Sequence, residues 1–125
     1  MIRNLTRRNV VSRDETYCVS MGSRMKGLMF CTPKKRKDFC LVLISPVLRR
    51  ISLHMWFVFS SIDVIFANKE YEIVDLKRDF KPFSAYSSKT KACYAIELPA
   101  GTIPRNRAHV GDRLSFGTGA YPRVK

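Results

Sequence analysis

Short stretches in which apolar and polar residues alternate constrain the fold of this chain more than any other feature. The clearest is residues 51–59, where every second residue from Ile51 to Phe59 is apolar and the intervening face includes Ser52 and His54. Successive side chains of a strand point to opposite faces, so this pattern predicts a strand with one packed side. The same alternation predicts strands at residues 15–20, 91–98 and 112–116.

Other segments predict strands from their turns and their apolar runs. Residues 39–44 (FCLVLI) are apolar on both faces, which is typical of a central strand, and Ser45-Pro46 should then break its ladder. Residues 62–67 and 70–76 are predicted to pair through a tight two-residue turn at Asn68-Lys69.

Helical patterns are sparse by comparison. Residues 21–28 predict one short helix, residues 100–109 a single helical turn, and residues 80–89 an ordered crossing loop. The chain is therefore predicted to be mainly β: a compact sandwich or jelly-roll-like fold, or a partly closed barrel, of about seven or more short strands with one or two short helices. With no linker or repeat, residues 1–125 are expected to form a single domain, with 117–125 as a flexible tail.

The composition is strongly basic. Lys and Arg number 23 against 10 Asp and Glu, a net charge of +13, which indicates an anionic partner such as nucleic acid or another polyanion. Residues 105–113 add His109 and three arginines, which predict a solvated basic turn. The candidate anion-binding residues are Lys34, Lys35, Arg36, Lys37, Arg49 and Arg50.

Several classes of site and segment are not indicated. The first 15 residues lack the apolar core of a secretion signal, and no stretch approaches the roughly 20 apolar residues of a membrane span. We therefore expect an unprocessed, cytoplasmic, monomeric protein without membrane contact. The four cysteines form no CxxC pair, so we expect reduced, partly buried thiols and assign no metal and no cofactor.

Two acidic residues lie in apolar surroundings. Asp63 lies inside the run 62–66 and Glu97 inside 94–98, and a buried carboxylate needs hydrogen bonds or a charged partner. No known catalytic motif is present, so our first hypothesis is a ligand- or partner-binding module without catalysis, with Trp56, Asp63, Tyr86 and Glu97 as ligand-binding candidates.

Two alternatives remain open. One is a hydrolase or carbohydrate-active enzyme that uses Asp63 and Glu97 as a carboxylate pair. The other is non-specific nucleic-acid binding through the basic N-terminal half. The remaining acids of residues 70–79, Glu70, Glu72, Asp75 and Asp79, are predicted to form a solvated strand face.

Three segments carry a resemblance to a known family. RMKGLMF at residues 24–30, HMWFVFSSIDVIF at 54–66 and AIELPAGTIPRNRAHVGDRL at 95–114, in this order and spacing, resemble the prokaryotic family called domain of unknown function 192, over about residues 12–116. The resemblance implies a compact, mainly β domain with no established activity. Its polar landmarks would be Asp63, Glu97 and Asp112, and its glycines Gly27, Gly101 and Gly111. Ile62, where many members have Pro, and the PKKRK run at 33–37 depart from the family pattern.

Overall fold

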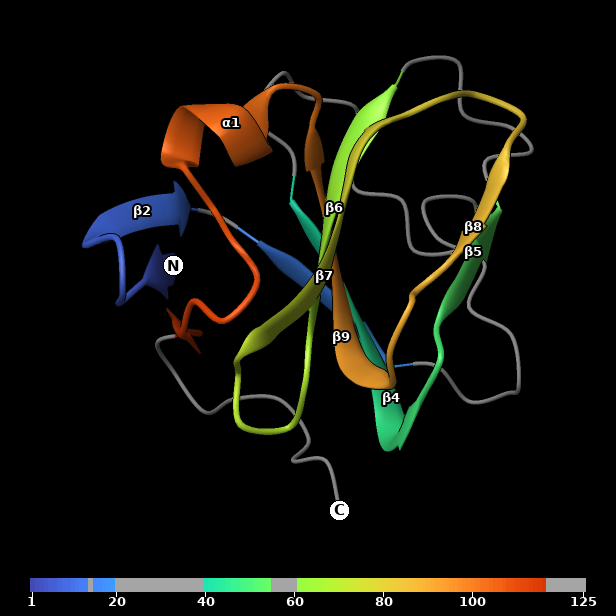
Figure 1. Cartoon of the computed structure of the whole chain (residues 1–125), viewed down its shortest axis with the longest axis horizontal. Helices are drawn as coiled ribbons and strands as arrows, with labels where there is room; N and C mark the ends of the chain where they lie inside the picture. Colours follow the sequence, from blue (N-terminus) through green and yellow to red (C-terminus); the bar gives the residue numbers. More distant parts are fainter. Residues whose placement is uncertain (14, 20–39, 55–60, 117–125) are drawn as a thin grey trace.

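A computed structural model of the chain describes residues 1–13, 15–19, 40–54 and 61–116 (Figure 1). These residues form ten strands and one short helix. In chain order the elements are β1 (Ile2–Asn4), β2 (Asn9–Ser12), β3 (Thr16–Val19), β4 (Leu41–Arg49), β5 (Ser52–His54), β6 (Ile62–Ala67), β7 (Ile73–Phe80), β8 (Ala85–Ser87), β9 (Ala92–Pro99), α1 (Thr102–Asn106) and β10 (Leu114–Ser115).

A five-stranded sheet forms the centre of the molecule. Its strand order is β3-β4-β9-β6-β7, in which β3 and β4 run parallel and all other neighbours run antiparallel. The central position of β9 explains its sequence, because a strand with neighbours on both edges and cover on both faces must be apolar throughout. Seven of the eight residues of β9 are buried, Glu97 among them.

Two smaller layers cover the two faces of this sheet. The three-stranded sheet β10-β1-β2 and α1 cover one face, where Ile2, Ile103 and Leu114 join the core. The two-stranded ribbon β5-β8 covers the other face, where Leu53 and Tyr86 pack against the sheet. Figure 1 shows this arrangement, with β2 and α1 on one side of the sheet and β5 and β8 on the other. The prediction of a mainly β, sandwich-like fold is confirmed, and the described strands form no closed barrel.

Local predictions of the strands differ from the structure in three places. The β6–β7 connection spans residues 68–72 rather than two residues, because the Asn68 Oδ1 atom accepts hydrogen bonds from the Glu70 and Glu72 N–H groups and Tyr71 has a φ of +64°. The predicted loop at 80–89 contains β8, which pairs with β5. The strand β4 continues past Ser45-Pro46, although its ladder with β9 is irregular between Ile44 and Arg49, as a proline in a sheet requires.

Some predictions were confirmed and others lie outside the described residues. The single helical turn is α1, entered through Gly101 at a φ of +91°, a conformation that favours glycine. Cys40 and Cys93 are buried free thiols. No helix of the described chain is long and apolar enough to cross a membrane. The helix expected at 21–28, the end of the strand expected at 51–59 and the tail at 117–125 lie outside the described residues.

Candidate nucleic-acid interface

The carboxylate of Asp63 is fully engaged by the backbone. The side chain is 1% exposed, and Oδ2 accepts hydrogen bonds from the N–H groups of Gly101 (3.1 Å) and Ile103 (2.9 Å), while Oδ1 accepts one from Asp79 N–H (2.9 Å). These contacts attach β6 to the first turn of α1 and to the end of β7. The structure thus explains the aspartate inside an apolar strand by a role in holding the fold.

Glu97 is buried in a different way. It lies in β9 opposite Leu41 of β4 and Val64 of β6, is 1% exposed, and none of the described residues donates a hydrogen bond to its Oε2 atom. Burial raises the pKa of Glu97 to about 8, because removal from water disfavours the charged form. At neutral pH this side chain is therefore mostly a neutral acid.

The sheet register separates these two carboxylates. Asp63 is opposite Leu98 and Val64 is opposite Glu97 in the β6–β9 ladder, and directly opposed residues share a face. Because Asp63 and Val64 are adjacent in one strand, Asp63 and Glu97 project from opposite faces of the sheet. The carboxylate pair of the hydrolase hypothesis is therefore not formed, and that alternative was wrong on its geometry.

The Tyr86 side chain is also part of the packing. Its hydroxyl donates to the Asp75 Oδ2 atom (2.6 Å), and its ring lies 5.8 Å from Phe66 and 6.3 Å from Phe80 between centroids. Burial, and after it the hydrogen bond to Asp75, raises the pKa of Tyr86 to about 12. Asp75 is only 5% exposed, so the prediction of a solvated strand face was wrong at this residue. Trp56 lies outside the described residues, and ligand binding by these candidates stays a prediction.

A fourth buried carboxylate, Asp112, organises the N-terminal hairpin. Its Oδ2 atom accepts hydrogen bonds from Asn4 Nδ2 (2.9 Å), Arg7 Nε (3.1 Å) and His109 N–H (3.0 Å). Burial alone would raise the pKa of Asp112, but the hydrogen bonds from Asn4, Arg7 and His109 outweigh it and lower the pKa. The carboxylate thus stays ionised and joins the β1–β2 turn to the loop after α1.

This junction brings two distant basic segments together. Asn9 Nδ2 donates to the Asn106 carbonyl (2.7 Å), and Leu5 N–H donates to the Arg113 carbonyl (2.7 Å), so the β1–β2 hairpin lies beside α1 and the strand β10. The arginines of these segments are all exposed. We call them the arginine surface: Arg3, Arg7, Arg8, Arg105, Arg107 and Arg113.

Few carboxylates neutralise the arginine surface. Arg7 pairs with Asp112 at 3.1 Å, and Arg113 pairs with Glu72 at 3.6 Å. No carboxylate among the described residues lies within ion-pair distance of the other four arginines. Within the described part of the chain, four guanidinium groups of this surface therefore have no charged partner, and guanidinium is the group best suited to phosphate oxygens.

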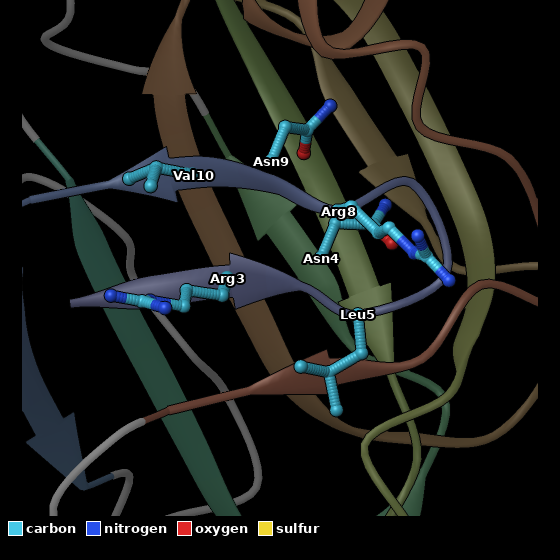
Figure 2. Close-up of a pocket in the computed structure, with 6 residues that line it drawn as sticks. All are labelled: Arg3, Asn4, Leu5, Arg8, Asn9 and Val10. Atoms are coloured by element: carbon cyan, nitrogen blue, oxygen red, sulfur yellow. The ribbon is translucent and has the colours of Figure 1, made fainter.

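A hollow of about 290 Å³ lies on this hairpin. It is lined by Arg3, Asn4, Leu5, Arg8, Asn9 and Val10. Figure 2 shows that the Arg3 and Arg8 side chains point toward opposite ends of the hairpin rather than toward one another. The charges are thus spread along the surface, which suits a chain of anionic groups better than a single small anion.

Aromatic side chains that could stack on bases are rare on the described surface. Tyr71, whose carbonyl accepts a hydrogen bond from Leu114 N–H next to Arg113, packs its ring on Tyr94 (5.5 Å between centroids) and Phe116 (5.0 Å). Phe83 is the exposed aromatic residue of the described chain, and it lies between β7 and β8. The arrangement favours contact with a phosphate backbone over stacking with unpaired bases.

The structure distributes the anion-binding candidates differently from the prediction. Lys34, Lys35, Arg36 and Lys37 lie outside the described residues. Arg49 is the last residue of β4, and Arg50 follows it in the connection to β5, whose Leu53 packs on the face of the central sheet away from β1 and α1. The basic turn around His109 is confirmed as exposed at its three arginines. The sequence reasoning did not place this turn beside Arg3, Arg7 and Arg8. About a hundred residues separate the two segments, and they meet through tertiary contacts: the β1–β10 pairing and the hydrogen bonds of Asp112, Asn9 and Leu5.

The fold and this surface define a small β-sandwich domain with one strongly basic side. A family model described as an uncharacterized ACR family, domain of unknown function 192, matches residues 10–116. The chain belongs to this family, as the sequence motifs indicated.

Archaeal relatives agree with this assignment. The UPF0127 protein of Thermococcus sibiricus is 35% identical over 116 residues, which cover 93% of this chain and 74% of that protein. The UPF0127 protein of Pyrococcus furiosus is 35% identical over 115 residues, covering 90% of this chain and 95% of that protein. The function of the family is uncharacterised.

Two solved structures have the same fold. One, from Sinorhizobium meliloti and described as a proposed transcription regulator, has a TM-score of 0.68 at 25% identity and covers 79% of this chain and 78% of its own. The other, a protein of unknown function from Novosphingobium aromaticivorans, has a TM-score of 0.68 at 16% identity and covers 82% of this chain and 74% of its own.

Proposed function

We propose that this domain is a binding module for nucleic acid, which it contacts through the phosphate backbone at the arginine surface. The observation that carries the proposal is the assembly of six exposed arginines from both ends of the chain, with only two paired to carboxylates among the described residues. Neutralising phosphates releases their condensed counterions, and this release drives most sequence-independent binding.

Two features favour duplex over single-stranded nucleic acid. Contact with a duplex backbone needs cations spread along a surface, as Arg3 and Arg8 are in Figure 2, whereas single-strand binders add exposed aromatic rings. The described arginine surface has no exposed aromatic residue. The description of the Sinorhizobium meliloti relative is compatible with a nucleic-acid partner, and a cytoplasmic location belongs to the same proposal.

The test is a titration of a fluorescently labelled duplex of arbitrary sequence at several salt concentrations, followed by anisotropy. We expect the logarithm of the association constant to fall linearly with the logarithm of salt, with a slope of about −0.9 per phosphate neutralised. The triple variant Arg8→Gln/Arg105→Gln/Arg107→Gln should bind at least about tenfold more weakly and lose roughly three units of slope.

A matched control variant distinguishes binding at the arginine surface from a general effect of the net charge. Lys69, Arg78 and Lys81 are exposed and lie outside the arginine surface, and the variant Lys69→Gln/Arg78→Gln/Lys81→Gln loses the same three charges. This control should retain most of the affinity. Equal losses in the two triple variants, or an affinity that is independent of salt, would refute an interface at the arginine surface.

A further inference from the structure

A second basic surface forms where β4 leads into β5. The residue Arg49 is paired with Ala92 in the β4–β9 ladder, and Ile51 N–H donates to Ser88 Oγ (3.0 Å) while Ser88 N–H donates to the Ile51 carbonyl (2.9 Å). These bonds hold residues 49–51 against residues 88–92. The second basic surface consists of Arg49, Arg50, Lys89 and Lys91.

The carboxylate of Asp75, which accepts a hydrogen bond from Lys89 N–H, is turned into the fold. The carboxylate of Asp75 is 5% exposed, and its oxygens accept hydrogen bonds from the Tyr86 hydroxyl and from the N–H groups of Leu76 and Lys89. The contact between Lys89 and the Asp75 carboxylate is therefore made by the backbone N–H group of Lys89. No ion pair within the described chain involves Arg50, Lys89 or Lys91, all of which are exposed.

The two basic surfaces lie on opposite sides of the central sheet. The β4–β5 and β8–β9 connections lead into the β5-β8 ribbon, whose Leu53 and Tyr86 pack on one face of the sheet. The arginine surface is built on β1, β2 and α1, which pack on the other face through Ile2 and Ile103. In Figure 1, β2 and α1 lie on one side of the sheet, and β5 leads from the end of β4, at the bottom of the view, to the other side.

We propose that the domain bridges two nucleic-acid duplexes, one held at the arginine surface and the other at the second basic surface. This inference rests on the proposed function, because it requires the first surface to bind duplex. One duplex cannot reach both sides of the sheet without wrapping around the domain, so the second surface would recruit a separate duplex. Two sites on one small domain raise the local concentration of each duplex near the other.

The experiment mixes two short duplexes, one with a donor and one with an acceptor fluorophore, with the full chain at about 50 mM salt, where backbone contacts are strong. We expect energy transfer between the duplexes at intermediate protein concentration and its loss when protein is in large excess. The variant Arg50→Gln/Lys89→Gln/Lys91→Gln should lower the transfer at least about fivefold while weakening the binding of one duplex less than about threefold. All three side chains are exposed, and circular dichroism would verify the fold of each variant.

The outcomes distinguish the two proposals. If the wild-type chain binds one duplex but gives no transfer, or if transfer persists unchanged in the second-surface variant, bridging at this surface is refuted while the proposed function stands. If the chain binds no duplex, the proposed function itself fails. Val47 and Leu48 are exposed beside Arg49, so binding to vesicles with anionic lipid in place of bridging would also overturn the inference.

Discussion

Replacing Glu97 by glutamine should change how the stability of this domain depends on pH. The carboxyl group lies between Leu41 and Val64 in the middle of a buried sheet face, and none of the described residues bonds to its Oε2 atom. Burial therefore raises the free energy of the ionised form of Glu97 and not that of its neutral form. Glutamine has nearly the same shape but never ionises, so Glu97→Gln isolates the ionisation from the packing.

The direction in which stability changes with pH follows from the pKa values of Glu97 in the unfolded and folded states. The unfolded chain releases the proton near the ordinary value of 4.5, whereas burial raises the pKa of the folded state to about 8. Between these values the folded state holds a proton that the unfolded state has lost, so stability is full below about pH 4.5 and falls as pH rises through 8. One pH unit of difference corresponds to about 1.4 kcal/mol, which gives a loss of about 3 kcal/mol by pH 7 and about 5 kcal/mol by pH 9.

The assay is urea unfolding followed by circular dichroism at intervals from pH 4.5 to pH 9. We expect the Glu97→Gln variant to be up to about 2 kcal/mol less stable than wild type at pH 5, because the amide is imperfectly satisfied, and clearly more stable at pH 9. Glu70→Gln, at an exposed glutamate, is the control and should follow wild type. A wild-type stability that does not fall between pH 5 and pH 9 would refute the reasoning, because it would mean that the buried carboxylate is well satisfied.

Three further substitutions test the other carboxylates. Asp63→Asn replaces an acceptor of three backbone N–H groups by an amide that offers one acceptor oxygen, and should lower the free energy of unfolding by about 2–4 kcal/mol in urea titrations. Because the folded pKa of Asp112 is lowered, wild-type stability should fall as pH drops through the acid range, and Asp112→Asn should remove this part of the dependence. Glu72→Gln frees Arg113 and should tighten duplex binding about two- to fivefold in the anisotropy assay, whereas unchanged binding would exclude Arg113 from the interface.

The strands of the central sheet could be predicted because the hydrophobic pattern of each one is, by itself, typical of a buried strand. The run FCLVLI and the alternating 94–98 segment fit buried strands wherever the chain places them. The strands β1 and β2 were not predicted, because IRN and NVVS carry little periodicity. They form through ladders with each other and with β10, more than a hundred residues from β1. Such pairing depends on the whole topology rather than on local preference.

The candidate site could also be predicted only in part from the sequence. The contiguous run at 33–37 is conspicuous in the sequence, whereas the arginine surface is divided between residues 3–8 and 105–113. Sequence reasoning correctly singled out Asp63 and Glu97 as buried carboxylates. The sequence could not show that Asp63 and Glu97 project from opposite faces of the sheet. That follows from the β6–β9 register, in which Glu97 is opposite Val64, the neighbour of Asp63 in β6.

The buried acids also explain why the surface is more basic than the composition alone suggests. Four carboxylates, those of Asp63, Asp75, Glu97 and Asp112, lie inside the fold, at exposures of 5% or less. Three of them hold backbone or side-chain donors, and the fourth is mostly neutral at pH 7. They therefore offer little negative charge to the surface, while the arginines of the hairpin and of the α1 loop remain exposed. The net charge of +13 already counts all these acids as negative, so protonation of Glu97 makes the protein still more basic. The fold gathers exposed arginines, and with them the attraction for a polyanion, where β1, β2 and α1 meet.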